Sequence, residues 1–118
     1  MIELNKSACD VMLEVGVSAA TDITGFGLAG HAMEMAQGSN VTLVIDLAKL
    51  PLFAGIDQID VTKFRTRASK SNREYTEAST RLDGTPDPTR LEFFYDAQTS
   101  GALLISVPAA NAAVLVKR

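Results

Sequence analysis

The sequence predicts one domain with an α/β or α+β layer fold, in which a small mixed sheet is covered by helices. Its 118 residues are about one domain's worth of chain. The 47% of hydrophobic residues, against 21% charged, suffices for a core and argues against a disordered chain. Helical and strand patterns also interleave. We expect a two-layer sandwich whose strands, near 41–46 and 103–107, are covered by helices that include 6–15 and 25–37.

The first two helices have plausible ends. Asn5 can cap a helix over residues 6–15, where apolar side chains recur at helical spacing. Gly16 can end it, because glycine accepts the left-handed conformation beyond the last turn. The second helix is predicted over 25–37, with Gly38 as its stop.

Two apolar segments predict strands. The segment 41–46 begins with uncharged, largely β-branched residues and is the clearest strand pattern in the chain. The segment 103–107 is the second, and Pro108 can then open a helix over 109–117. Residues 56–92 carry no clear pattern apart from a turn cluster near 83–88.

Charge and cysteine content exclude several classes of protein. Eleven Lys and Arg oppose fourteen Asp and Glu, so a general nucleic-acid surface is not expected. The single cysteine, Cys9, excludes a disulfide scaffold and reads as a small core residue. No apolar run approaches the roughly 20 residues that span a membrane, and residues 1–6 lack a secretory pattern. We expect a cytoplasmic domain that binds neither nucleic acid nor membrane.

The segment 21–31 carries the densest functional signal. Its three glycines expose backbone amides where a helix begins, which suits an anionic group. Asp22 stands just upstream, and a carboxylate beside a phosphate needs a cation such as Mg²⁺ between them. The same residues allow a simpler interpretation, in which Asp22 or Thr24 caps the helix. Both interpretations remain open on these residues alone.

A dinucleotide site is a second hypothesis for this segment. Gly25, Gly27 and Gly30 have the spacing of the dinucleotide fingerprint, and Asp46 follows about 20 residues later. However, polar residues interrupt the strand that should precede the glycines. An unpaired Asp22 would also repel a pyrophosphate that lacks a metal.

Other patterns favour structural roles. His31 falls on the apolar stripe of its helix and is expected to be a core histidine. Residues 96–102 suit a tight turn whose backbone approaches a neighbour or a ligand. A basic cluster could contact nucleotide phosphates or form a solvated loop; its members are Arg65, Arg67, Lys70 and Arg73.

The motif Thr21-Asp22-Ile23-Thr24-Gly25-Phe26-Gly27, continued by Gly30-His31, resembles a known family. The chain looks like the C-terminal domain of the selenophosphate synthetase (selenide, water dikinase) family, in the aminoimidazole ribonucleotide synthetase superfamily. Further matches include Leu4-Asn5-Lys6, Ile45-Asp46, Leu50-Pro51-Leu52, Asn72 with Glu74-Tyr75, and Asp96-x-Gln98-Thr99-Ser100-Gly101 with Leu103-Leu104.

The resemblance implies a parent enzyme that makes selenophosphate from selenide and ATP, releasing AMP and phosphate, with Mg²⁺ as cofactor. It implies that Asp22 is a magnesium ligand. The expected nucleotide-binding residues are Thr24, Gly25, Gly27, Asn72, Thr99 and Ser100. The other metal carboxylates and a reactive Cys or selenocysteine belong to the family's N-terminal domain, so no catalytic residue is expected here. Cys9 does not match that reactive position.

We therefore expect residues 1–118 to be a truncated C-terminal domain that forms one wall of the Mg·ATP cleft in a homodimeric parent and is inactive alone. The chain departs from the family pattern at Tyr95, Ala97 and Ala102, where Cys, Pro and Gly are usual. It also lacks the Pro-Gly-Gly stretch before Asn72. These departures keep open a third hypothesis, a non-catalytic domain for assembly or regulation.

Overall fold

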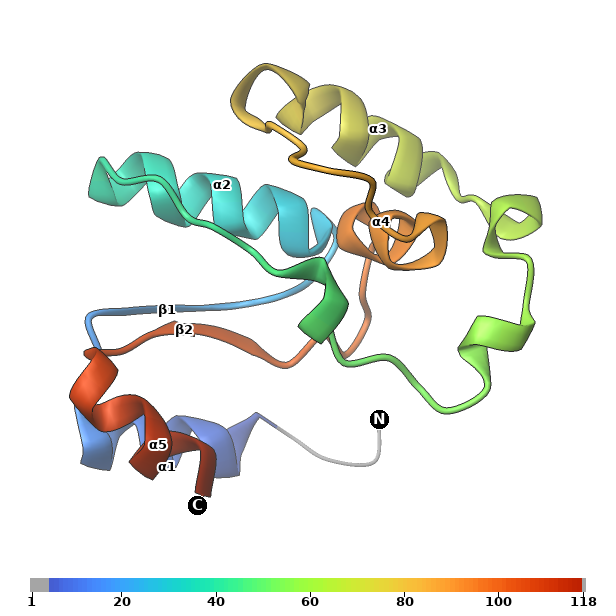
Figure 1. The fold of residues 1–118 in the computed structure, drawn as a ribbon. Coiled ribbons are helices and arrows are strands. Elements are labelled where there is room, and N and C mark those ends of the chain that lie inside the picture. The colour runs from blue at the N-terminus through green and yellow to red at the C-terminus, as the bar shows by residue number, and fades with distance from the viewer. Residues whose placement is uncertain (1–4, 118) are drawn as a thin grey trace.

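The structure, a computed structural model, describes residues 5–117, apart from the Asp57 side chain. Its α+β class agrees with the sequence prediction (Figure 1). The elements are α1 (Lys6–Val15), β1 (Ala19–Asp22), α2 (Gly27–Ser39), α3 (Arg67–Thr76), α4 (Pro88–Tyr95), β2 (Leu103–Ser106) and α5 (Ala109–Lys117). Short 3-10 helices lie between α2 and α3 and after α3.

The sheet of the described chain consists of β1 and β2. They pair antiparallel, with Ala19 opposite Ser106 and Asp22 opposite Leu103. The strand predicted over 103–107 is thus confirmed, whereas the sheet is antiparallel and not mixed.

The strand predicted over 41–46 is wrong, because the segment is extended but has no strand partner within residues 5–117. The N–H of Val41 bonds to the carbonyl of Ala36 in α2, at 3.0 Å. Ile45 packs on the core, while the side chain of Val44 is 94% exposed. β-branched residues favour an extended backbone, but a strand also needs a second backbone to accept its hydrogen bonds.

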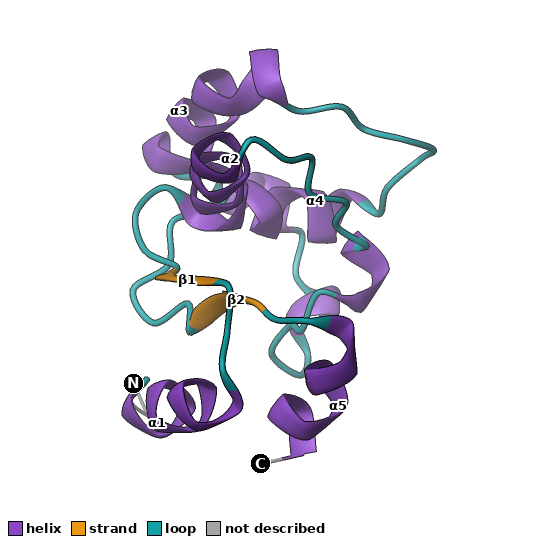
Figure 2. Ribbon diagram, turned by 90° about the vertical axis from the view of Figure 1, so that its left-hand side faces the viewer, coloured by secondary structure: helices purple, strands orange, loops and turns teal. Residues whose placement is uncertain are grey.

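Helices lie on both sides of the sheet. Figure 2 shows α2, α3 and α4 on one side, and α1 and α5 on the other. The predicted helices 6–15 and 25–37 are confirmed as α1 and α2, and 109–117 as α5. A buried cluster of Leu28, Ala29, Phe94 and Tyr95 joins α2 to α4, so the core lies between these helices and the sheet.

Helix ends differ in detail from the predictions. The Asn5 side chain makes no capping bond, whereas Gly16 ends α1 at φ 77° as expected. Gly38 lies inside α2 and does not stop it. The helix ends at Asn40, which adopts the left-handed conformation at φ 53°. Asparagine tolerates that conformation better than other non-glycine residues, so it can supply the stop.

No sequence pattern predicted α3 or α4. The buried residues of α3 are polar, namely Ser69, Asn72 and Thr76, so no apolar periodicity marks the helix. Thr66 caps it through a 3.1 Å bond from the Ser69 N–H, in the stretch that lacks the family's glycines. Asp87 caps α4 in the same way, at 2.8 Å.

Two smaller predictions concern single residues. His31 is buried, at 8% exposure, as expected of a core histidine. Cys9 is half-buried and is not one of the buried core residues, so the prediction that it is a core residue is wrong. Within residues 5–117, no helix has both the length and the apolar character that a membrane crossing requires.

Candidate functional site

The two motifs singled out in the sequence cross each other in the fold. The N–H of Ile23 donates to the carbonyl of Ala102 at 3.0 Å, and the N–H of Gln98 donates to the carbonyl of Thr24 at 3.0 Å. The first bond continues the β1–β2 pairing beyond Asp22. The loop 23–27 and the turn 96–102 therefore form one unit, which we call the motif crossing.

Two glycines make this close approach possible. A Cβ on Gly27 would lie 2.7 Å from the Asp96 carbonyl oxygen, and the residue has φ +65°. A Cβ on Gly101 would lie 2.5 Å from the Ile23 carbonyl oxygen. Both separations are shorter than van der Waals contact, so a side chain at either position would push the two segments apart. The turn at 96–102 thus approaches a neighbour closely, as the sequence predicted.

Asn72 ties the motif crossing to α3. Its side chain is buried, and its Nδ2 donates to the carbonyls of Gly25 and Tyr95, each at 2.9 Å. Both amide hydrogens are therefore used by backbone acceptors. In this structure Asn72 holds the loop in place, and its donors are not available to a nucleotide.

Asp22 ends β1 at the edge of the motif crossing. The residue is exposed, and its side chain has no hydrogen bond or ion pair among residues 5–117. The residue before α2 is Phe26, and no side chain caps that helix. The capping interpretation of Asp22 and Thr24 is therefore wrong, which leaves the Asp22 carboxylate without a partner in the described part of the chain.

A metal ion would find one suitable ligand here. In the described part of the chain, no three His, Cys, Asp or Glu side chains lie together as a metal site. A single carboxylate fits Mg²⁺, which commonly takes one or two protein carboxylates and completes its shell with water and phosphate. Asp22 thus fits as one member of a shared ligand set.

The other predicted ligand groups differ in their availability. The N–H of Gly27 donates to the Thr24 carbonyl at 3.1 Å, so the turn itself uses it. The N–H of Gly25 has no acceptor within residues 5–117 and stays open to a ligand. Thr99 and Ser100 are exposed in the turn that follows α4.

A buried carboxylate that the sequence did not reveal organises the basic cluster. Glu92 lies 2.9 Å from Arg65 and 3.5 Å from Arg73, and it accepts a hydrogen bond from the Ser69 hydroxyl. The Arg73 guanidinium also stacks 4.2 Å above the ring of Tyr95. The solvated-loop interpretation is therefore wrong for these two arginines, because both bind Glu92 of α4, Arg73 from α3 and Arg65 from the segment that precedes α3. No local pattern could have found Glu92, since its partners lie about 20 residues upstream.

Burial perturbs two ionisable groups beside the motif crossing. Burial raises the pKa of the Asp96 carboxyl, and the nearby charge of Glu92 raises it further. The Ala97 amide and the Thr66 hydroxyl oppose this by hydrogen bonding to the charged form. Burial also raises the pKa of Tyr95, against the effect of the Arg73 charge.

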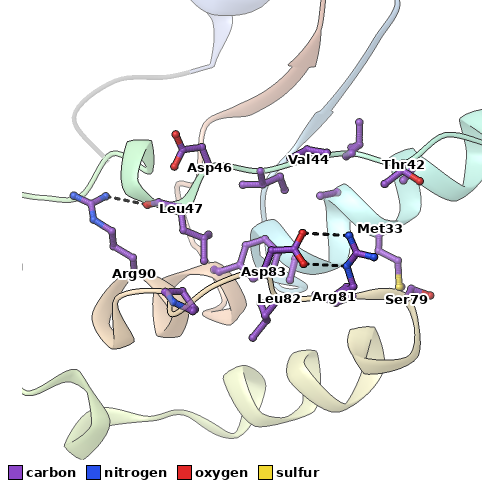
Figure 3. A pocket seen from close by; sticks show the side chains of 18 of the residues that line it. Met33, Thr42, Val44, Asp46, Leu47, Ser79, Arg81, Leu82, Asp83 and Arg90 are labelled. Carbon is purple, nitrogen blue, oxygen red and sulfur yellow. Dashed lines mark hydrogen bonds and ion pairs between the residues drawn. The ribbon is translucent and has the colours of Figure 1, made fainter.

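A groove of the described surface lies elsewhere. It has a volume of about 1120 Å³ and runs between α2, the segment 41–48 and residues 79–90 (Figure 3). Arg81 and Asp83 form an ion pair of 3.1 Å on its wall, and Arg90 donates to the Leu47 carbonyl at 3.3 Å. None of the predicted nucleotide-binding residues lines this groove.

The geometry argues against the dinucleotide hypothesis. The fingerprint requires two parallel strands around the helix, yet β1 pairs antiparallel with β2 and the segment 41–46 is unpaired. Asp46 accepts a 3.0 Å hydrogen bond from the Ala48 N–H and so caps the short helix Leu47–Lys49.

Comparison with known proteins gives consistent matches. Residues 1–117 match the family model "AIR synthase related protein, C-terminal domain". Similar proteins include "Selenide, water dikinase" of Caldanaerobacter subterraneus subsp. tengcongensis, 41% identical over 98% of this chain and 33% of that protein. The protein of the same name from Geobacter metallireducens is 44% identical over 91% of this chain and 31% of its own length. The "Selenide, water dikinase" of Nitratidesulfovibrio vulgaris (strain DP4) is 37% identical over 89% of this chain and 30% of its own length. The chain thus spans about a third of the length of these relatives.

Proposed function

Because the chain belongs to the AIR synthase related proteins, as their C-terminal domain, we propose that it forms one wall of the Mg·ATP cleft of a selenide, water dikinase. The parent enzyme makes selenophosphate from selenide and ATP, with release of AMP and phosphate. The remaining two thirds of such a protein supply the other metal ligands and the reactive group. The whole enzyme is expected to be a cytoplasmic homodimer.

The observation that carries this proposal is the free carboxylate of Asp22 at the motif crossing. Three features support it as a ligand. The side chain is exposed and has no partner within residues 5–117. Asp22 is the last residue of a paired strand, and the backbone bond of Ile23 to Ala102 continues the pairing, so its backbone is held on both sides. The open N–H of Gly25 lies three residues further along the chain and can donate to an anionic oxygen.

In this proposal the domain binds and orients, and it transfers no group itself. Bound Mg²⁺ would neutralise phosphate charge, which is the main requirement of phosphoryl transfer. Asp22 would hold the ion from this side of the cleft, and Gly25 would donate to a phosphate oxygen. Asn72 would keep the loop rigid, and the exposed hydroxyls of Thr99 and Ser100 would be available to the nucleotide.

The test is the substitution Asp22→Asn in a full-length protein that contains this chain. The amide has the same shape as the carboxylate but lacks its charge. We expect the apparent Mg²⁺ affinity to fall at least 10- to 100-fold. Replacing a residue that only hydrogen-bonds to a metal ligand already lowers metal affinity by about that factor. Selenide-dependent ATP turnover, measured against Mg²⁺ concentration, reports the change.

Asp10→Asn is the matched control. Asp10 is an exposed carboxylate on α1 whose one ion pair among residues 5–117 is with Lys6, at 2.7 Å, and such surface pairs contribute little. Its variant should keep wild-type Mg²⁺ dependence. If Asp22→Asn behaves like Asp10→Asn, the proposed cleft role is wrong. If a full-length protein with intact N-terminal ligands shows no turnover at all, the assembly or regulatory hypothesis replaces it.

A further inference from the structure

His31 forms hydrogen bonds with Thr24 in the motif crossing. It lies in the first half of α2, and its side chain is 10% exposed. Its Nε2 is 3.1 Å from the Thr24 backbone nitrogen and 3.1 Å from the Thr24 hydroxyl oxygen. Its Nδ1 faces Glu34, at 3.7 Å. The Phe26 ring meets the imidazole edge-on, with ring centroids 5.8 Å apart.

These contacts determine where the protons are. A backbone N–H can only donate, so Nε2 of His31 must be the acceptor. The neutral ring then carries its proton on Nδ1, on the side of Glu34. Since Nε2 has no hydrogen, its contact with the Thr24 hydroxyl requires that the hydroxyl donates as well. Both polar hydrogens of Thr24 are therefore directed at one ring nitrogen.

This arrangement restricts what Thr24 can do for a ligand. With its hydrogen committed to His31, the hydroxyl oxygen of Thr24 offers only lone pairs to anything else. A phosphate oxygen at neutral pH is an acceptor and gains nothing from such a group. A divalent cation, a bound water or a ligand hydroxyl can use it.

We infer that His31 is a positioning residue of the Mg·ATP site, which fixes the loop after Asp22 and presents Thr24 as an acceptor to a cation or its bound water. This inference rests on the proposed function. It also makes the expectation for Thr24 more specific, because the predicted nucleotide-binding residue becomes an oxygen ligand of the cation or of its bound water. His31 itself contacts no substrate, because its Nε2 accepts hydrogen bonds from Thr24 and its Nδ1 faces Glu34.

The chain allows a matched pair of variants at this position. In His31→Gln, the side-chain amide oxygen can replace Nε2 as the acceptor for Thr24. In His31→Asn, the shorter side chain reaches only the position of Nδ1, so the acceptor is lost. Both variants remove the ring and its packing against Phe26, so a difference between them reports the hydrogen bond and not the packing.

The experiment uses a full-length protein that contains this chain. We expect the apparent KM for Mg·ATP to rise about 3- to 10-fold more in His31→Asn than in His31→Gln, as the loss of one hydrogen bond predicts. In the wild-type protein, ¹⁵N-resolved NMR of the ring should show Nδ1 protonated and Nε2 bare. The His31→Gln spectrum identifies the signal by its absence.

Equal KM values in the two variants, or a protonated Nε2, would overturn the inference and leave the proposed function standing. An Asp22→Asn protein with wild-type Mg²⁺ dependence would overturn the proposed function, and the inferred role would fall with it. If neither His31 variant folds, the ring protonation in the wild-type protein decides.

Discussion

Replacing Ala102 by glycine should stabilise the domain. Ala102 is exposed and adopts φ 62°, a left-handed conformation that strains a residue with a Cβ. This strain costs about 1–2 kcal/mol. Glycine relieves it but loses about 0.5–1 kcal/mol through the greater freedom of the unfolded chain. The hydrogen bond from Ile23 to the Ala102 carbonyl involves only backbone and is kept. The net gain should be about 0.5–1 kcal/mol.

Thermal unfolding followed by circular dichroism measures this gain. For a domain of this size it corresponds to a rise in Tm of about 2–5 °C. Ala97→Gly is the matched control, because Ala97 lies in the same turn without a positive φ. That variant should lose about 0.4–1 kcal/mol. If Ala102→Gly lowers Tm as much as Ala97→Gly does, the strain argument is refuted.

Three further predictions concern other sites. Gly101→Ala should lower the free energy of unfolding by about 1–3 kcal/mol, because the new Cβ would lie 2.5 Å from the Ile23 carbonyl oxygen. An unchanged midpoint of urea unfolding would contradict this close approach. Because the pKa of Asp96 is raised from 3.8, the native carboxyl keeps its proton where the unfolded chain has lost it. The free energy of unfolding should therefore fall as pH rises from 3.8 through the native pKa, and Asp96→Asn should remove that fall. If the free energy of unfolding, measured in urea, varies with pH in the same way in both proteins, this reasoning is wrong. Val44→Lys should leave Tm nearly unchanged, since the side chain is 94% exposed. It should also reduce self-association, measured by analytical sedimentation, because it places a charge on the unpaired segment 41–46. Equal self-association of the variant and the wild-type protein would contradict this reasoning.

Local patterns were sufficient for the elements whose boundaries depend on nearby residues. α1 and α5 follow their predicted bounds because a boundary residue adjoins each helix, Gly16 after the end of α1 and Pro108 before the start of α5. β2 was predictable from its apolar composition. The same logic failed at 41–46, where composition favours an extended backbone but cannot supply a partner strand. It also failed at α3, whose buried side chains are polar.

The candidate site divides in the same way. The motif around Asp22 and the turn at 96–102 were each evident from the sequence, because glycines and hydroxyl residues stand close together in them. Their crossing was not evident, since the bond between Gln98 and Thr24 joins distant parts of the chain. Asn72 was predicted to bind nucleotide, yet its donors are used by the carbonyls of Gly25 and Tyr95.

By itself, the sequence determined which residues could contribute chemistry and which short segments coil or extend, because both depend on residue type and near neighbours. Only the tertiary structure decided which hydrogen atoms remain for a ligand. Each donor of Asn72, Gly27 and Thr24 has an acceptor that folding brings within reach. The carboxylate of Asp22 gains none among the described residues. For Asn72 the acceptors are carbonyls 47 and 23 residues away along the chain, which meet only because the backbone packs closely at the motif crossing, and no local pattern encodes that approach.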